Sequence, residues 1–93
     1  MTLSQRRQKL RFRSWHRGTR EMDMILGSFA DRYIQEFSES ELDEYEELLC
    51  CSDPDLYNWY TGKEPVPEDQ DTIMMKKFQD FQISKNVDAA TGR

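Results

Sequence analysis

Apolar residues recur along the chain at the spacing of a helix face. In the clearest segment they occupy positions i, i+3, i+4, i+7 and i+11, at Met22, Ile25, Leu26, Phe29 and Tyr33. This spacing places the side chains on one stripe of an α-helix. Thr19 precedes the stripe and is a suitable N-cap, because its hydroxyl can accept a hydrogen bond from a free backbone N–H. The pattern predicts an amphipathic helix that follows Thr19.

Two further helices are predicted around this one. A basic helix extends from Leu3 to about Trp15, and its apolar residues are Leu3, Leu10, Phe12 and Trp15. Ser38 and Glu41 can form a capping box, in which each side chain bonds the backbone N–H of the other residue. The helix that starts there has an apolar face made of Leu42, Tyr45, Leu48 and Leu49.

The second half of the chain contains two more helical segments. Asp53 is expected to cap the first of them, with Pro54 in the first turn, where its missing N–H costs nothing. Gly62 can end this helix in a left-handed conformation, and residues 63–67 form an extended linker stiffened by two prolines. A last helix is predicted from about Asp69, with the apolar residues Ile73, Met74, Phe78 and Phe81.

These segments predict an all-α fold. No segment alternates between apolar and polar residues as a strand does, and short connections favour a compact bundle. We expect a single domain of about five short helices over residues 1–83, followed by a disordered C-terminal tail over residues 84–93.

Composition limits the class of protein. The chain has 93 residues, of which 37% are hydrophobic, enough for a modest core, and 33% are charged, which is unusual for a membrane protein. No apolar run approaches the roughly 18–20 residues that span a bilayer. The start of the chain has no apolar segment typical of a signal peptide. We therefore expect a cytoplasmic protein that does not insert into a membrane.

Charge is distributed unevenly along the chain. Residues 1–20 contain seven basic residues and no acidic one, whereas Lys63 is the only basic residue between Glu36 and Asp71. The basic first helix could attract anions, but the acidic remainder argues against nucleic-acid binding, which needs a continuous positive face.

Candidate catalytic and metal-binding residues are few. Cys50 and Cys51 are adjacent, and a disulfide between neighbours would close a strained ring, so we interpret them as reduced thiols. His16 is the only histidine, and no zinc-ligand spacing is present. Catalysis by a thiol with His16 has no local support in the sequence, and no glycine-rich phosphate loop is present. We expect a binding protein that is not an enzyme and has no metal site.

Two motifs have no simple explanation in the core. In residues 17–21, Gly18 permits a sharp turn and Glu21 suits the positive end of a helix dipole. Alternatively, exposed Arg17, Arg20 and Glu21 beside that turn form a polar recognition surface. In residues 55–62, three aromatic residues fall within four positions, so at least one of them is expected to border solvent and could anchor a partner.

At these motifs the sequence resembles the succinate dehydrogenase assembly factor family. The resemblance covers about Arg6 to Phe81 and includes an Arg-Gly-x-x-Glu signature at Arg17, Gly18 and Glu21. Further matching segments are Glu21-Met22-Asp23, Leu26-Gly27-x-Phe29, Leu42-x-x-Tyr45-Glu46-x-Leu48-Leu49, Asp53-Pro54-Asp55-Leu56-Tyr57-x-Trp59 and Gly62-Lys63-Glu64-Pro65-Val66-Pro67. This order and spacing, in a chain of this length, make the resemblance specific.

The resemblance implies a five-helix protein that promotes covalent attachment of FAD to the flavoprotein subunit of succinate dehydrogenase, and also of fumarate reductase. It implies that the FAD belongs to that partner and that this chain has no cofactor of its own. The partner-binding residues that it implies are Arg17, Gly18 and Glu21, with Arg13, Arg20 and Asp23 as neighbours on the same face. It also favours a bacterial member of the family, and nothing in the sequence specifies an oligomer, so we expect a monomer.

One alternative function remains open. Some relatives have been described as antitoxins, so the chain could instead be an antitoxin-like or generic protein-binding adaptor, paired with a small membrane-associated partner. Both functions are binding functions, and the sequence does not separate them.

Overall fold

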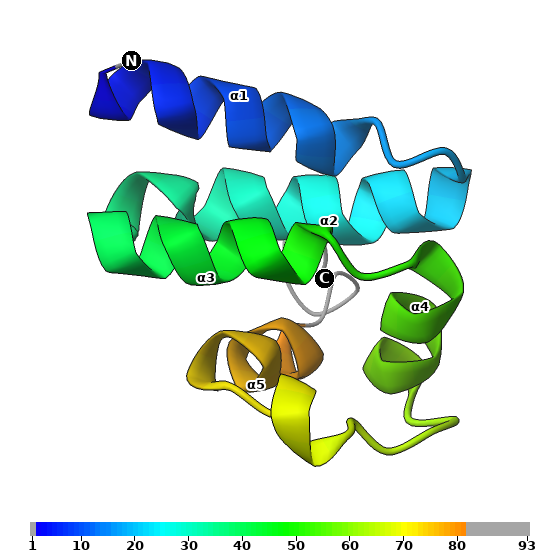
Figure 1. Cartoon of the computed structure of the whole chain (residues 1–93). Helices are drawn as coiled ribbons and strands as arrows, with labels where there is room; N and C mark the ends of the chain where they lie inside the picture. The colour runs from blue at the N-terminus through cyan, green and yellow to red at the C-terminus, as the bar shows by residue number, and fades with distance from the viewer. Residues whose placement is uncertain (1, 82–93) are drawn as a thin grey trace, which may run out of the picture.

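Five α-helices form the described part of the chain, residues 2–81 of the computed structural model (Figure 1). The helices are α1 (Leu3–Trp15), α2 (Arg20–Tyr33), α3 (Glu39–Leu49), α4 (Asp53–Thr61) and α5 (Ile73–Asp80). Two short 3-10 helices, η1 (Ile34–Glu36) and η2 (Glu68–Gln70), follow α2 and precede α5. Residues 2–81 contain no strand, so the prediction of an all-α fold with five helices is confirmed. The predicted domain end at Ile83 and the predicted tail lie outside the described residues.

Each of the five α-helices begins after a serine or threonine whose hydroxyl accepts a hydrogen bond from the backbone N–H three residues later. These caps are Thr2, Thr19, Ser38, Ser52 and Thr72. The predicted caps Thr19 and Ser38 are confirmed, and Ser38 forms the expected capping box with Glu41. A capped start satisfies backbone donors that have no partner within the helix.

Two predicted helix starts were wrong. Ser52, not Asp53, caps α4, so Asp53 is the first residue of the helix and its carboxylate remains available for another contact. The last helix begins at Ile73 rather than near Asp69, because Thr72 caps it and residues 68–70 form the separate turn η2. In both cases the helix begins after a residue whose hydroxyl accepts the capping hydrogen bond, Ser52 or Thr72.

The core lies between α2 and the helices around it. Helix α1 packs against α2 and α3, and α5 packs against α3 and α4. The stripe of α2 is buried as predicted except for Tyr33, which is half-buried. Ile73, which was predicted on the apolar face of the last helix, is 82% exposed. The buried residues of α5 are Met74, Met75 and Phe78.

The chain order brings two distant segments to one end of the molecule. Helices α1 and α2 lie side by side, joined by a short connection, and α4 lies near the start of α2 (Figure 1). Residues on both sides of this junction line a common pocket, which places the α1–α2 connection beside the first turns of α4.

Candidate partner-binding site

The connection between α1 and α2 is a turn held by side-chain bonds. Asp23 Oδ1 accepts hydrogen bonds from the backbone N–H groups of Arg17 and Gly18, at 2.5 and 3.3 Å. Gly18 has φ of 128°, which residues with a side chain rarely adopt. Asp23 and Gly18 therefore fix the shape of the turn.

Arg17 points into the protein. Its Nε donates to Asp53 Oδ1 at 2.8 Å, and its two terminal nitrogens donate to the carbonyl oxygens of Leu49 and Cys51, at 2.5 and 2.7 Å. Only 12% of its side chain is exposed. Arg17 is therefore not exposed as one interpretation of the motif expected, because the carbonyl groups at the end of α3 lack helical partners and attract a cation there. Arg17 joins the α1–α2 turn to the α3–α4 junction.

Arg20 and Glu21 lie in the first turn of α2 and are exposed. Neither side chain forms a hydrogen bond or ion pair with any of residues 2–81, so both charges remain free to meet another molecule. Arg13 is half-buried on α1, and its Nη1 lies 3.7 Å from Glu46 Oε2 on α3. Of the six predicted site residues, Arg20 and Glu21 thus have the exposed, unpaired side chains expected of a recognition surface.

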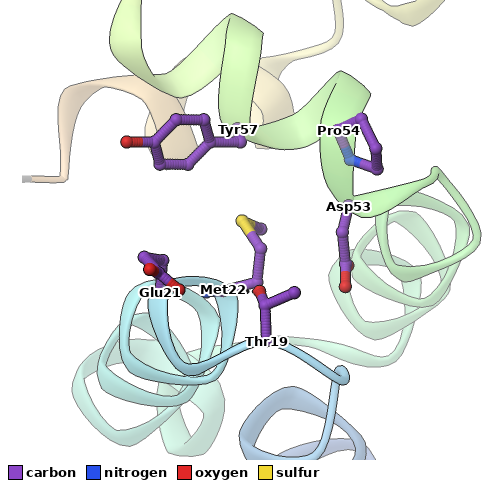
Figure 2. Close-up of a pocket in the computed structure, with 6 residues that line it drawn as sticks. All are labelled: Thr19, Glu21, Met22, Asp53, Pro54 and Tyr57. Carbon is purple, nitrogen blue, oxygen red and sulfur yellow. Dashed lines mark hydrogen bonds between the residues drawn. The ribbon is translucent and has the colours of Figure 1, made fainter.

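An open pocket of about 340 Å³ lies beside Glu21. Figure 2 shows Tyr57 of α4 across this pocket from Glu21 and Met22 of α2, with Asp53 and Pro54 along one side. Thr19 also lines the pocket, and the lining residues within 2–81 include two carboxylates and no basic side chain.

The sequence did not predict this pocket, because its lining comes from two segments, residues 19–22 and 53–57, that lie more than thirty positions apart. One signal was present, namely the expectation that an aromatic residue of the segment 55–62 borders solvent. It is confirmed, since Tyr57 and Tyr60 are half-buried whereas Trp59 is buried. Tyr57 is the aromatic residue that lines the pocket.

The residues considered for catalysis or metal binding have other partners. Burial and the nearby charge of Asp55 raise the pKa of the Cys51 thiol, and its Sγ lies 3.6 Å from Gln70 Oε1. His16 stacks on the ring of Phe12 with 3.9 Å between centroids. Within residues 2–81, no group of three or more histidine, cysteine or acidic side chains is placed to hold a metal ion. None of the helices in that range is long and apolar enough to span a bilayer.

Comparison with known proteins identifies the family. Residues 8–82 match the sequence model of a family described as "flavinator of succinate dehydrogenase". The chain is 37% identical over 76 residues to the "FAD assembly factor SdhE" of Acetobacter pasteurianus, covering 82% of this chain and 70% of that protein.

Two mitochondrial relatives are named succinate dehydrogenase assembly factor 2. The protein of Dictyostelium discoideum is 44% identical over 73 residues, covering 78% of this chain, and that of Drosophila grimshawi is 38% identical over 76 residues, covering 80%. The aligned region spans 52% of each of these two relatives, about half of their length. The chain belongs to the family of succinate dehydrogenase assembly factors that act in flavinylation.

Proposed function

We propose that this chain binds the FAD-bearing flavoprotein subunit of succinate dehydrogenase and promotes covalent attachment of FAD to that subunit. The names of the family and of its bacterial relative support the assembly role. The binding step is our inference from the surface of this chain, and the FAD is assigned to the partner, with no cofactor held by the chain itself.

The observation that carries the proposal is a pair of unpaired charges on a fixed turn. Arg20 and Glu21 are exposed without a partner among residues 2–81, while Arg17 and Asp23 hold the turn beside them by internal bonds. A surface whose backbone is already ordered loses little conformational entropy when it binds. Charged groups presented in this way favour recognition of a partner with complementary charge.

The chain is proposed to act by selecting a conformation of the flavoprotein rather than by supplying a reacting group. Every reacting group would then belong to the flavoprotein subunit and its FAD. If the competent conformation were populated at about 1%, raising it to about 99% would need about 5.5 kcal/mol of preferential binding. Three anchor residues at about 2 kcal/mol each could provide this free energy.

The test is flavin fluorescence in a denaturing gel, because only covalently bound flavin remains with the polypeptide after denaturation. The flavoprotein subunit is matured with FAD, with and without this chain. We expect a fluorescent band that depends on the chain and is lost, or reduced at least tenfold, with Glu21→Ala. A tenfold reduction corresponds to a loss of about 1.4 kcal/mol in the free energy of binding, which is within the range for an interface anchor.

A matched control is available on α3. Glu44 is an exposed acidic residue without an ion pair among residues 2–81, so Glu44→Ala changes the net charge equally and should leave the band unchanged. Equal bands with and without the wild-type chain would contradict the proposed function and favour the adaptor interpretation.

We extend the proposal to the flavoprotein subunit of fumarate reductase, on the basis of the sequence resemblance alone. The same gel, run with that subunit, tests the extension independently. A band that never depends on the chain would restrict the function to succinate dehydrogenase.

A further inference from the structure

The pocket beside Glu21 combines apolar walls with negative charge. Met22, Pro54 and Tyr57 provide apolar surface, and Glu21 and Asp53 provide carboxylates, while none of the described residues that line the pocket is basic. Figure 2 shows these groups arranged around one space, with α2 on one side and the start of α4 on the other. Apolar walls with a carboxylate at the edge suit a side chain that has a long aliphatic stem and a cationic end.

The two carboxylates retain binding capacity. Glu21 has no hydrogen-bond or ion-pair partner among residues 2–81. Asp53 Oδ1 accepts the bond from Arg17 Nε at 2.8 Å, and no other described residue donates to its second oxygen, Oδ2. Arg17 forms an ion pair with Asp53, whereas the charge of Glu21 has no ion-pair partner among residues 2–81.

The aromatic wall is also suited to a cation. The ammonium group of Lys63, on the linker after α4, lies 5.8 Å from the centroid of the Tyr57 ring. This contact within the chain shows that a cation can approach the electron-rich face of this ring. A guanidinium group stacks on aromatic rings better than an ammonium group does, because it is planar and less strongly hydrated.

The charge of the lining argues against other occupants. A nucleotide, phosphate or dicarboxylate would meet two carboxylates here and no basic side chain from the described part of the chain. The Met22 N–H donates the capping bond to the Thr19 hydroxyl oxygen, so an anion would have to compete with that oxygen for this donor. A neutral apolar side chain would leave the carboxylate of Glu21 without a partner in a partly desolvated place.

We propose that this pocket receives an arginine side chain of the flavoprotein subunit, with the guanidinium group against Tyr57 and paired with Glu21. This inference rests on the proposed function, and it adds Tyr57 and Pro54 to the residues that recognise the partner. A guanidinium group has five N–H donors in one plane, so it can bond a carboxylate with two parallel hydrogen bonds while its face contacts a ring.

The first experiment uses the isolated full chain and short peptides. The chain is labelled with ¹⁵N, and its amide spectrum is recorded during titration with acetyl-Gly-Arg-Gly-amide or with the same peptide containing citrulline. Citrulline has nearly the shape of arginine but no charge, so it is the matched control. We expect saturable shifts at pocket residues with the arginine peptide at millimolar concentration, and binding at least several-fold weaker with citrulline. Equal shifts for both peptides, or shifts with neither, would overturn the proposal.

The second experiment measures the affinity of the chain for the flavoprotein subunit. Tyr57→Leu keeps apolar volume against the core but removes the aromatic ring, so the fold should be retained, which a thermal melt checks. We expect about tenfold weaker binding, typical of an interface anchor. Phe12→Ala is the control, because Phe12 is an exposed aromatic residue on α1 that does not line the pocket. Its affinity should equal that of the wild-type chain.

A double variant distinguishes one shared contact from two separate ones. If Tyr57 and Glu21 hold the same arginine, Tyr57→Leu together with Glu21→Gln should weaken binding by less than the product of the two single effects. Binding of Tyr57→Leu at wild-type affinity, while Glu21→Ala still abolishes flavinylation, would overturn the pocket proposal and leave the proposed function standing. A wild-type chain without any effect on flavinylation would instead overturn the proposed function.

Discussion

At the scale of single residues, one short motif has two different tasks. Arg17 and Asp23 direct their side chains to internal partners and fix the turn, whereas Arg20 and Glu21 present theirs to solvent. The structural turn that the sequence left open as one interpretation therefore concerns Arg17 and Asp23, while Arg20 and Glu21 are the residues to which the proposed recognition surface applies. Substitutions can distinguish the residues that hold the turn from the exposed ones, because only the former should lower the stability of the fold.

Arg17→Ala should destabilise the fold. The substitution leaves two carbonyl oxygens and the Asp53 carboxylate without their donor at a site where little of the arginine is exposed. We expect a loss of about 2–3 kcal/mol in the free energy of unfolding, measured by urea denaturation. Arg20→Ala, at an exposed residue of the same charge, should change it by less than about 0.5 kcal/mol. Equal effects of the two substitutions would contradict the internal role of Arg17.

Tyr45 should make the fold sensitive to alkaline pH. Its ring is fully buried, and its hydroxyl lies 2.5 Å from Ser14 Oγ, which itself donates to the carbonyl oxygen of Leu10. Burial raises the pKa of Tyr45 above its ordinary value of 10.0, and the hydrogen bond with Ser14 opposes this only in part. The folded protein thus keeps a proton that the unfolded chain loses above about pH 10, so stability falls as the pH rises further.

The measurement is the urea midpoint between about pH 9 and pH 11. We expect the wild-type chain to lose up to about 1.4 kcal/mol more per pH unit than Tyr45→Phe, whose ring has no proton to release. Tyr57→Phe, at a half-buried tyrosine, should decline with pH as the wild type does. Parallel curves for wild type and Tyr45→Phe would show that another group causes the alkaline loss.

At the scale of elements, the sequence predicted each helix because local signals determine where a helix starts and which face is apolar. The hydroxyl caps and the stripe of α2 were readable from spacing alone. The starts of α4 and α5 were not, since Ser52 and Asp53 are both suitable caps for α4, and the residues before α5 form the separate turn η2. Such local signals do not determine which helices pack together, for example α1 on α2.

Gly27→Ala should destabilise the packing of α1 on α2. A Cβ atom added at Gly27 would clash with the indole ring of Trp15, so the ring or the helices must move. Helix propensity alone predicts a gain of about 1 kcal/mol for this substitution, whereas overpacking costs about 1–3 kcal/mol. We expect the steric effect to dominate, with a lower melting temperature. In a Trp15→Ala background the same substitution should be neutral or stabilising, and a loss there would show that Trp15 is not the obstacle.

At the scale of the whole molecule, the candidate site depends on tertiary structure more than the fold class does. The pocket joins Glu21 to Tyr57, and the Arg17 bonds join the same turn to the end of α3. Periodicity within one helix contains no information about which distant helix lies beside it. The resemblance indicated a region of the surface, and the structure shows which of its described side chains have no partner within residues 2–81.

Phe29 joins the aromatic side chains of the core. Phe29 is fully buried, and its ring lies within 5.1–6.2 Å of five other aromatic rings on α2, α3, α5 and the turns beside them. Those five residues are Tyr33, Phe37, Tyr45, Phe78 and Phe81. Contacts of one ring with several helices couple their stability, so its loss should affect the whole domain.

Phe29→Ala should abolish cooperative unfolding near room temperature. Truncating a buried phenylalanine costs about 3–5 kcal/mol, while the total stability of small domains is about 5–15 kcal/mol, with short chains near the lower limit. We expect the near-ultraviolet circular dichroism of the packed aromatic rings to be largely lost and the thermal transition to broaden. Ile73→Ala, at an apolar residue that is 82% exposed, should melt as the wild type does. A sharp transition for Phe29→Ala within a few degrees of the wild type would mean that the remaining rings close the cavity, and that the five helices are held together by contacts other than this aromatic cluster.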